Sequence, residues 1–390
     1  MLKASKILIP VLAVMVLLGA VGAWDRLAHG KANLNFGSYI PWGLWVGLYI
    51  YMVGISGGAF LLVFLHHGLG ISCLRRASLY ALPVSLFTLG AGLLLVLADL
   101  GHMERFWKLY LQPNPGSILA AMVWVYTAFI LVLLVMLLAL AKGRSRWLKP
   151  LSVLGFFLVI TFGGGEGALF GVLGARPYWS SGLLPIRFLF SALLAGVAVV
   201  AFTLTLFRKW PEDRDHWDAV GFLRYLILGL LAVNVLIEFS EYSITQYAGT
   251  PAVIEAHHLV AFGPYWWVFW IVQLFIGFLL PAILLIPSWG LRPFNFALAG
   301  FLIGIGYAGT KQNIVLPGLA VPEFRALPEA FVHNRLSVAY FPSVMEWLMA
   351  IGAIAAAALL FVLAVEYLPF LRGPAPTGAR FAGAKEGRAA

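Results

Sequence analysis

The sequence predicts an all-α, polytopic membrane protein with about ten transmembrane helices. Hydrophobic residues make up 62% of its 390 positions and charged residues only 11%, whereas about 25% of an ordinary globular protein is charged. A soluble fold of this length could not bury so much apolar surface in its core. The chain also holds 14 Trp, 14 Tyr and 29 Phe, and aromatic rings are enriched at bilayer interfaces. These observations exclude a soluble protein.

Ten apolar segments are long enough to cross the hydrocarbon core of a bilayer, which takes about 20 helical residues. In chain order, we predict them at 7–24, 41–66, 80–101, 118–141, 151–174, 186–207, 219–241, 265–286, 294–317 and 344–367. The first segment follows Lys3 and Lys6, as the apolar part of a signal peptide would. Because further spans follow it directly, we interpret it as a retained helix, with cleavage as the alternative.

Basic residues gather on one side of these spans. Sixteen of the 26 lysines and arginines fall on the side of the two termini: Lys3, Lys6, Arg75, Arg76, Lys142, Arg144, Arg146, Lys149, Arg208, Lys209, Arg214, Arg292, Arg372, Arg380, Lys385 and Arg388. The positive-inside rule therefore predicts that both termini lie in the cytoplasm. Because the charges lie in short loops, the net charge of +10 indicates topology rather than binding of nucleic acid. Residues 1–370 form the predicted membrane domain, and the basic, Gly/Ala/Pro-rich tail 371–390 is expected to be disordered.

A faint internal repeat groups the spans. The fifth span ends in GGGEGALFGVLGARP and the ninth in AGTKQNIVLPGLAVP, and aligning the two endings places Glu166 opposite Lys311. The third and seventh spans each carry an acid near their outer end. We therefore predict two four-helix bundles with one flanking helix at each end of the chain, and a chance match is the alternative. The bundles cover 41–174 and 186–317, and the flanking helices cover 7–24 and 344–367.

Ionisable side chains concentrate near the outer end of the spans, opposite the termini. Such residues are costly inside a membrane and are usually functional. Asp99, His102 and Arg105 are spaced i, i+3 and i+6, which predicts that they share one helix face at the end of the third span. Glu166 follows the glycines 163–165, so we expect a break in the fifth helix that opens its backbone to a cavity or a ligand.

Structural roles are the alternatives for these charges. Asp99 and Arg105 could form a salt bridge that ties a helix end to its loop. Glu238 and Glu241, at the outer end of the seventh span, could reach interfacial water. Lys311, near the outer end of the ninth span, could pair with a carboxylate across the bundle.

The chain offers few groups for a metal or a haem. Its single cysteine, Cys73, excludes disulfides, thiolate zinc sites and cysteine-ligated iron–sulfur clusters. A membrane b-type haem needs two inward-facing histidines at matched depth. No such pair is expected among His29, His66, His67, His102, His216, His257, His258 and His333. We therefore expect no haem and no metal bound by this chain, and any cluster must belong to a partner.

Three motifs, in their order along the chain, resemble one family. They are YIPWGLWVGLYIYMVGISGGAFLL at 39–62, ADLGHMERFW at 98–107 and ARPYWSSGLLPIRFLFSALLAG at 175–196. Together they look like the NrfD-type family, the membrane subunits of polysulfide reductase and related complexes. The ten-span length and the ending AYFPSVMEWLMAIG at 339–352 resemble its longer branch, which includes membrane subunits of hydrogenases and of sulfur-metabolising redox complexes.

The resemblance implies a quinone-linked function. Members of the family carry no redox cofactor of their own and bind a quinone, menaquinone or ubiquinone, near the extracytoplasmic face of the prokaryotic inner membrane. A ferredoxin-like iron–sulfur subunit docks there, often linked to a molybdopterin enzyme, a hydrogenase or a multihaem cytochrome. The chain would then be one subunit of a respiratory oxidoreductase, embedded in membrane lipid, rather than an enzyme alone. We expect the loop 103–117, with its basic and aromatic residues, to form the docking face.

A quinone needs a flat apolar slot and hydrogen-bond partners for its two oxygens. The predicted quinone-binding residues are Tyr49, Gly54, Gly57, Glu166 and Arg176. Many relatives have a Tyr before the Ala-Arg-Pro motif, where this chain reads Gly-Glu-Gly, so the role of that Tyr would pass to Glu166, Tyr49 or another group.

Quinone chemistry also needs a route for protons. His102 is the predicted proton donor or acceptor, since its ordinary pKa lies near neutrality. Asp99 would orient the imidazole or relay its proton, and Arg105 would keep Asp99 ionised. The predicted relay residues are Glu166, Glu238, Glu241 and Lys311. We expect protons to exchange with the outside only, with uptake from the cytoplasm as the alternative.

Two other functions fit parts of the sequence. Repeats, broken helices and buried carboxylates also occur in secondary transporters, but here the charges cluster near one surface rather than at the midplane. A passive anchor that positions a soluble oxidoreductase is the second alternative, although an anchor does not need a polar cluster at one membrane depth.

Overall fold

The computed structural model describes residues 3–207, 214–286, 288–322, 324, 326–330, 333, 336–368 and 371. Within these ranges every regular element is a helix, and ten helical segments are long and apolar enough to cross a membrane. The prediction of an all-α, ten-span, multi-pass membrane protein is confirmed. Apart from Leu371, the predicted tail 371–390 lies outside the described residues.

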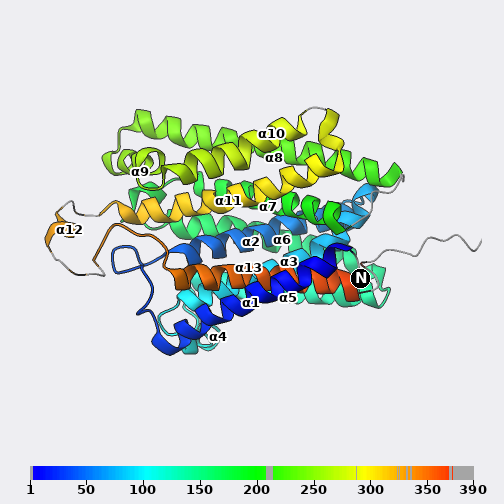
Figure 1. The fold of residues 1–390 in the computed structure, drawn as a ribbon, viewed down its shortest axis with the longest axis horizontal. Coiled ribbons are helices and arrows are strands. Elements are labelled where there is room, and N and C mark those ends of the chain that lie inside the picture. Colours follow the sequence, from blue (N-terminus) through cyan, green and yellow to red (C-terminus); the bar gives the residue numbers. More distant parts are fainter. Residues whose placement is uncertain are drawn as a thin grey trace, which may run out of the picture.

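The long helices follow one another along the chain, and several of their connections carry shorter helices (Figure 1). They are α1 (Lys3–His29), α2 (Leu44–Val63) with its π-helical extension η1 (Phe64–Gly68), α3 (Arg75–Asp99), α5 (Ile118–Ala141), α6 (Leu148–Gly171), α7 (Leu184–Phe207), α8 (Arg214–Ala248), the π-helix η6 (Val268–Leu279) continued by α10 (Leu280–Leu285), α11 (Pro293–Ala320) and α13 (Val344–Tyr367). The shorter helices are η2 (Ser72–Leu74), η3 (Met103–Arg105), α4 (Lys108–Leu111), η4 (Ser145–Trp147), η5 (Pro177–Trp179), α9 (Pro251–Phe262), η7 (Ser288–Leu291) and α12 (Leu327–Ala330). Most bounds lie close to the predicted ones, because uninterrupted apolar runs mark the spans. α8 departs most, since it continues well beyond the predicted end at 241.

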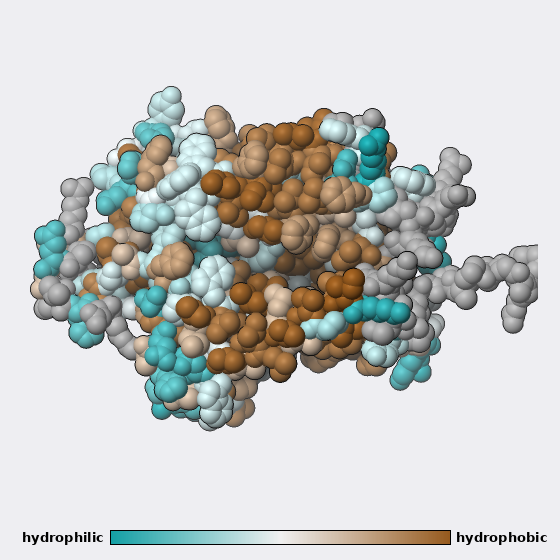
Figure 2. Space-filling view, viewed as in Figure 1, coloured by the Kyte–Doolittle hydropathy of each residue, from teal (hydrophilic) through white to brown (hydrophobic). Residues whose placement is uncertain are grey.

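The helices run along the long axis of the molecule, and the surface changes character along that axis. Hydrophobic residues form a broad central band, and hydrophilic residues lie toward both ends (Figure 2), as expected for a protein that crosses a bilayer. The N-terminus lies at one end, which we call the terminal end. The other end, which we call the loop-rich end, carries α4, α9 and α12 (Figure 1).

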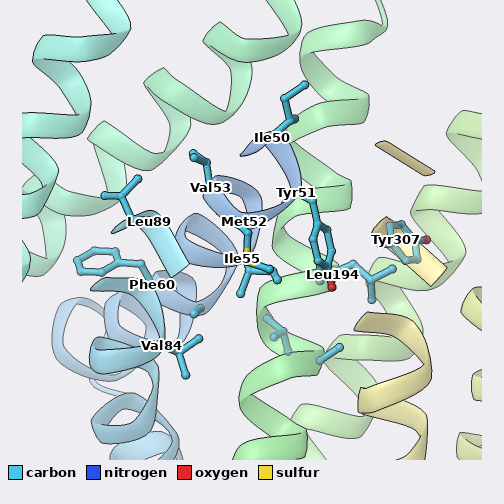
Figure 3. Close-up of a cluster of buried hydrophobic side chains, with 14 of the residues drawn as sticks. Ile50, Tyr51, Met52, Val53, Ile55, Phe60, Val84, Leu89, Leu194 and Tyr307 are labelled. Atoms are coloured by element: carbon cyan, nitrogen blue, oxygen red, sulfur yellow. The ribbon is translucent and has the colours of Figure 1, made fainter. Parts of the chain in front are cut away.

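Helix α2 lies at the centre of the helix assembly. All its residues are buried, and it packs against α3, α6, α7 and α11. A Cβ atom on Gly58 or on Gly196 would overlap the backbone of the facing helix, so α2 and α7 approach as closely as only small residues allow. Ile50, Val53 and Ile55 of α2 lie in the buried core (Figure 3). The division into two four-helix bundles remains a prediction, and α2 and α7 join its two halves.

The first and last spans pack along each other. Helix α1 contacts α13 along its length, and a Cβ atom on Gly19 would overlap the backbone of Gly352. These two glycines therefore set the distance between the flanking helices.

Candidate functional site

A chain of buried hydrogen bonds links α2, α5 and α6. The hydroxyls of Tyr49 and Tyr126 are 2.8 Å apart, and the Tyr126 hydroxyl donates to Oε1 of Glu166 at 2.9 Å. All three side chains are buried, and the two tyrosine rings meet edge to face. Each residue lies within about two and a half turns of the helix end at the loop-rich end. The geometry places a carboxyl group and two phenols in one water-poor path.

The glycines before Glu166 do not break the helix. The expectation of a broken fifth span is wrong, because α6 runs without interruption from Leu148 to Gly171. Instead, a small residue is needed where α6 meets α7: a Cβ atom on Gly167 would lie 2.6 Å from the carbonyl oxygen of Leu184. The Gly-rich sequence reflects close helix packing, which brings Glu166 into the interior.

Lys311 lies on the other side of the same buried region. Its ammonium donates to Oγ of Ser191 in α7 at 2.7 Å and lies 4.1 Å from the centre of the Phe188 ring, a distance typical of a cation–π contact. Lys311 and Glu166 attract each other electrostatically, but each bonds to another residue rather than directly to the other. We call Tyr49, Tyr126, Glu166, Ser191 and Lys311 the first cluster.

A second cluster forms around a partly buried ion pair. Nη2 of Arg187 in α7 donates to both carboxylate oxygens of Glu238 in α8, at 2.7 and 2.8 Å. The amide of Gln273 donates to Glu238 at 3.1 Å, and the amide of Asn313 donates to Gln273 at 2.9 Å. We call these four residues the second cluster. Glu238 therefore bonds to protein side chains. The structural alternative, in which it only reaches interfacial water, does not account for these bonds.

Two helices connect the clusters. Ser191 and Arg187 lie one turn apart on α7, and Lys311 and Asn313 are close neighbours on α11. The Ser181 hydroxyl, in the loop just before α7, donates to Glu241 at 3.1 Å. The predicted relay residues Glu166, Lys311, Glu238 and Glu241 thus lie in one polar layer near the loop-rich end.

The predicted face of Asp99, His102 and Arg105 does not form. α3 ends at Asp99, and Leu100 takes an extended conformation with ψ of 139°, so His102 and Arg105 lie beyond the helix. The His102 ring contacts Glu104, with Nδ1 and Oε1 2.9 Å apart, and both side chains are about two-thirds exposed. Nε of Arg105 also lies 3.6 Å from Oε1 of Glu104. The Glu104 carboxylate has a lowered pKa, mainly because of its own backbone hydrogen bond and then because of His102.

Asp99 itself is buried and is approached by a basic residue that the sequence did not predict. Arg26 of α1 donates from Nε to the carbonyl oxygen of Ala98 at 2.7 Å and from Nη2 to that of Leu100 at 2.5 Å, which satisfies carbonyls at the end of α3. Oδ1 of Asp99 is buried and accepts no hydrogen bond from the described residues. This oxygen is free to accept a bond from a ligand or a water.

The remaining predicted quinone ligands serve packing in this structure. A Cβ atom on Gly54 would lie 3.2 Å from the Ala192 side chain of α7, and one on Gly57 would lie 3.1 Å from the Phe162 ring of α6. Nη1 of Arg176 donates to the carbonyl oxygen of Val321 at 3.0 Å, so it ties the Ala-Arg-Pro loop to the end of α11. The predicted slot is thus filled by side chains at the two glycines.

Aromatic rings lie next to the first cluster. Trp42, before α2, stacks on Trp179 with ring centres 5.8 Å apart, and Phe170 meets both rings edge to face. Phe170 follows Glu166 by one turn of α6. Flat aromatic faces beside a carboxyl group and phenols suit a quinone, which needs apolar faces for its ring and hydrogen-bond partners for its oxygens. No group of three His, Cys, Asp or Glu side chains suited to a metal lies within the described residues.

Sequence reasoning missed five members of these clusters: Tyr126, Ser191, Arg187, Gln273 and Asn313. Arg187 carried a usable signal, because an arginine inside an apolar span requires a partner. Gln273 interrupts an otherwise apolar helix in the same way. Tyr126 and Ser191 carried none, since single hydroxyl groups are common in membrane helices.

Comparison with known proteins identifies relatives over almost the whole chain. A family model described as "Polysulphide reductase, NrfD" matches residues 33–299. The C subunit of the selenate reductase of Mesobacillus selenatarsenatis is 31% identical over 405 aligned residues, which cover 94% of each protein. The Hdr-like menaquinol oxidoreductase integral membrane subunit of Archaeoglobus fulgidus is 24% identical and covers 91% of this chain and 92% of the relative. The menaquinone reductase integral membrane subunit of Nitratidesulfovibrio vulgaris is 25% identical, and the alignment covers 90% of this chain and 88% of the relative.

Proposed function

Because the chain belongs to the NrfD polysulphide reductase family, we propose that it is the quinone-interacting membrane subunit of a multisubunit respiratory oxidoreductase. It exchanges electrons between the quinone pool and an iron–sulfur partner. The observation that carries the proposal is the buried chain from Tyr49 through Tyr126 to Glu166. Relatives named for menaquinol and menaquinone chemistry support it.

The bound quinone supplies two-electron, two-proton redox chemistry, and the residues of the first cluster manage the protons. Glu166 holds a proton or releases it, because its only described partner is the hydroxyl of Tyr126. When Glu166 gains or loses its proton, Tyr126 reverses its hydrogen bond and so passes the proton change to Tyr49, whose hydroxyl lies within hydrogen-bond distance. Lys311 offsets the negative charge of Glu166 in a low-dielectric interior, where such attraction is stronger than in water.

The residues at the end of α3 connect this site to water in the proposal. Asp99 offers a buried oxygen that has no hydrogen-bond partner within the described residues, and the exposed His102–Glu104 pair exchanges protons with the aqueous phase. Arg105 lies beside that pair. Glu238 and Glu241 extend the polar layer across α8.

The exposed segment after α3 forms the docking face for a ferredoxin-like iron–sulfur subunit, which connects to a molybdopterin, hydrogenase or multihaem cytochrome subunit. Phe106, Trp107 and Leu111 are all exposed, and Lys108 lies 5.8 Å from the Trp107 ring. Exposed aromatics mixed with cations are enriched in protein interfaces. Crosslinks from the purified complex should run mainly from 103–117 to the partner, and crosslinks mainly from 69–79 and 142–150 would contradict this docking face.

The loop-rich end faces the outside of a prokaryotic inner membrane, and both termini face the cytoplasm. The basic loops near the terminal end support this orientation through the positive-inside rule. Since the first cluster lies near the loop-rich end, protons exchange with the outside only, and the quinone reaction is electrically silent.

A reconstituted complex tests the function. The complex is purified with its partners and placed in liposomes that contain menaquinone and a potential-sensitive dye. We expect co-purified quinone, menaquinone-linked turnover without a membrane potential, and loss of turnover in an assembled Tyr126→Phe complex. Tyr225→Phe, which alters a lipid-exposed ring of α8, is the matched control and should keep full turnover.

The two rival functions give different results in the same liposomes. A passive anchor would show turnover by the soluble partner but no bound quinone and no effect of Tyr126→Phe. A secondary transporter would accumulate solute without any quinone requirement. Either pattern would overturn the proposal. A membrane potential generated by the quinone reaction would overturn its electrically silent form.

A further inference from the structure

A cavity of about 250 Å³ lies between α8, η6 and α11, apart from the first cluster. None of the first-cluster residues lines it. We propose that this cavity binds the ring of a lipid-soluble, carbonyl-bearing compound of the quinone type, as a second site. The inference goes beyond the proposed function, which places a quinone beside Glu166.

The cavity walls follow from helix periodicity. Asn234, Glu238 and Tyr242 repeat every four residues along α8 and all line the cavity, so they form one stripe on that helix. Phe269 and Gln273 face it from η6, which is a π-helix over twelve residues. π-helical turns occur frequently at functional sites.

Two phenols supply the free hydrogen-bonding groups. Glu238 and Gln273 already bond to protein partners. Tyr242 and Tyr307 line the cavity and make no hydrogen bond within the described residues. Figure 3 shows the Tyr307 ring on α11 with its hydroxyl pointing away from the core side chains around α2. Since each phenol can donate one bond, the cavity suits a ligand that brings acceptor oxygens.

The cavity opens toward the surface that lipid covers. Phe239 lines it and is 68% exposed, so a ligand can enter sideways from the bilayer. The volume is smaller than the 300–1,000 Å³ typical of pockets that enclose a whole drug-sized ligand. It therefore holds a ring and leaves a long apolar tail in the membrane. Quinones and lipid esters both combine carbonyl oxygens with such a tail, and the aromatic walls favour a quinone ring.

Photolabelling of the purified complex tests this site. The probe is an azido-naphthoquinone with an isoprenoid tail, and labelled peptides are mapped by mass spectrometry. We expect label on α8 or η6, between 234 and 242 or between 269 and 278. The double variant Tyr242→Phe/Tyr307→Phe should bind about tenfold to thirtyfold more weakly, because it loses two hydrogen bonds. Tyr247→Phe, on the same helix but 94% exposed and outside the cavity, should label as the wild type does.

A second variant and a competition experiment test whether the label reports specific binding in this cavity. Leu274→Trp fills the cavity from η6 and should remove the label even if the double variant fails to assemble. Short-tailed menaquinone should displace the probe, whereas phosphatidylethanolamine at the same concentration should not. Displacement by the phospholipid, label confined to α2, α5 and α6, or label unchanged in both variants would each overturn the proposal. Label on α8 or η6 in a complex that shows no quinone-linked turnover would overturn the proposed function but would still support this second site.

Discussion

The first cluster and the segment from Asp99 to Arg105 both place acids near the loop-rich end, but their surroundings differ. Tyr49, Tyr126 and Glu166 come from three helices and are buried. His102 and Glu104 come from one short stretch of chain and are about two-thirds exposed. Exposed ion pairs typically contribute only about 0.2–1 kcal/mol, because water competes for each group. Only the buried cluster can control a proton without water.

Glu166→Gln should cause the largest loss of activity in this comparison. Glutamine keeps the shape of the side chain and still accepts the Tyr126 bond, so the complex should assemble. It cannot exchange a proton, and a positioned acid–base group contributes about 10²–10⁴-fold, so quinone-linked turnover should fall at least about a hundredfold. Glu104→Gln is the matched exposed control and should change turnover little. Equal effects of the two variants would remove the distinction between the regions.

Arg187→Met should cost the most stability. It leaves the partly buried Glu238 without its cation, and because breaking a fully buried pair typically costs about 3–5 kcal/mol, we expect a loss toward the lower end of that range. We expect a lower unfolding midpoint for the purified complex, followed by tryptophan fluorescence. The double variant Arg187→Met/Glu238→Leu removes both charges and should recover most of the loss. A double variant no more stable than Arg187→Met would mean that packing, not charge, sets the cost.

His102→Ala should have a smaller effect on turnover than Glu166→Gln. Its imidazole is exposed and bonds to Glu104, so water can replace it as a route for protons. We expect turnover to fall by less than about tenfold, below the range for a positioned acid–base group, in a complex that assembles normally. Abolished turnover would reverse the comparison and place the essential proton donor in the exposed segment.

His257 should give the smallest effect, on the pH dependence of stability. Burial lowers its pKa to about 4, and Nε2 is buried without a partner in the described part of the chain. The unfolded chain takes up a proton near pH 6.5 while the folded chain does not, so stability should fall progressively as the pH drops from 6.5 toward 4. His257→Gln should reduce the difference between unfolding midpoints at pH 7.5 and pH 5. An unchanged difference would show that His257 does not cause it.

The fold was predictable from sequence because each span is a long apolar run whose length is fixed by the bilayer. The helix end at Asp99 was predictable too, although the spacing argument missed it. Gly101 follows shortly after Asp99, and glycine is a poor helix former, which favours a helix end there. The i, i+3, i+6 spacing of Asp99, His102 and Arg105 predicts a shared face only if the helix continues through all three residues.

The buried site was harder to predict. Glu166 stood out because carboxylates are rare in spans, but its partner Tyr126 lies forty residues away on another helix. Which helices lie side by side depends on close packing at small residues such as Gly167, and a single sequence does not state which backbone each glycine meets.

The contact of Gly19 with Gly352 has a consequence for how the protein is made. Helix α1 leaves the ribosome long before α13, because α13 lies more than 300 residues later in the chain. The glycine surface of α1 therefore stays exposed to lipid until α13 has been made, and the contact between the two helices forms only then. A chain that stops before Val344 would leave this surface without α13, so quality control in the membrane could recognise an unfinished protein by its first helix.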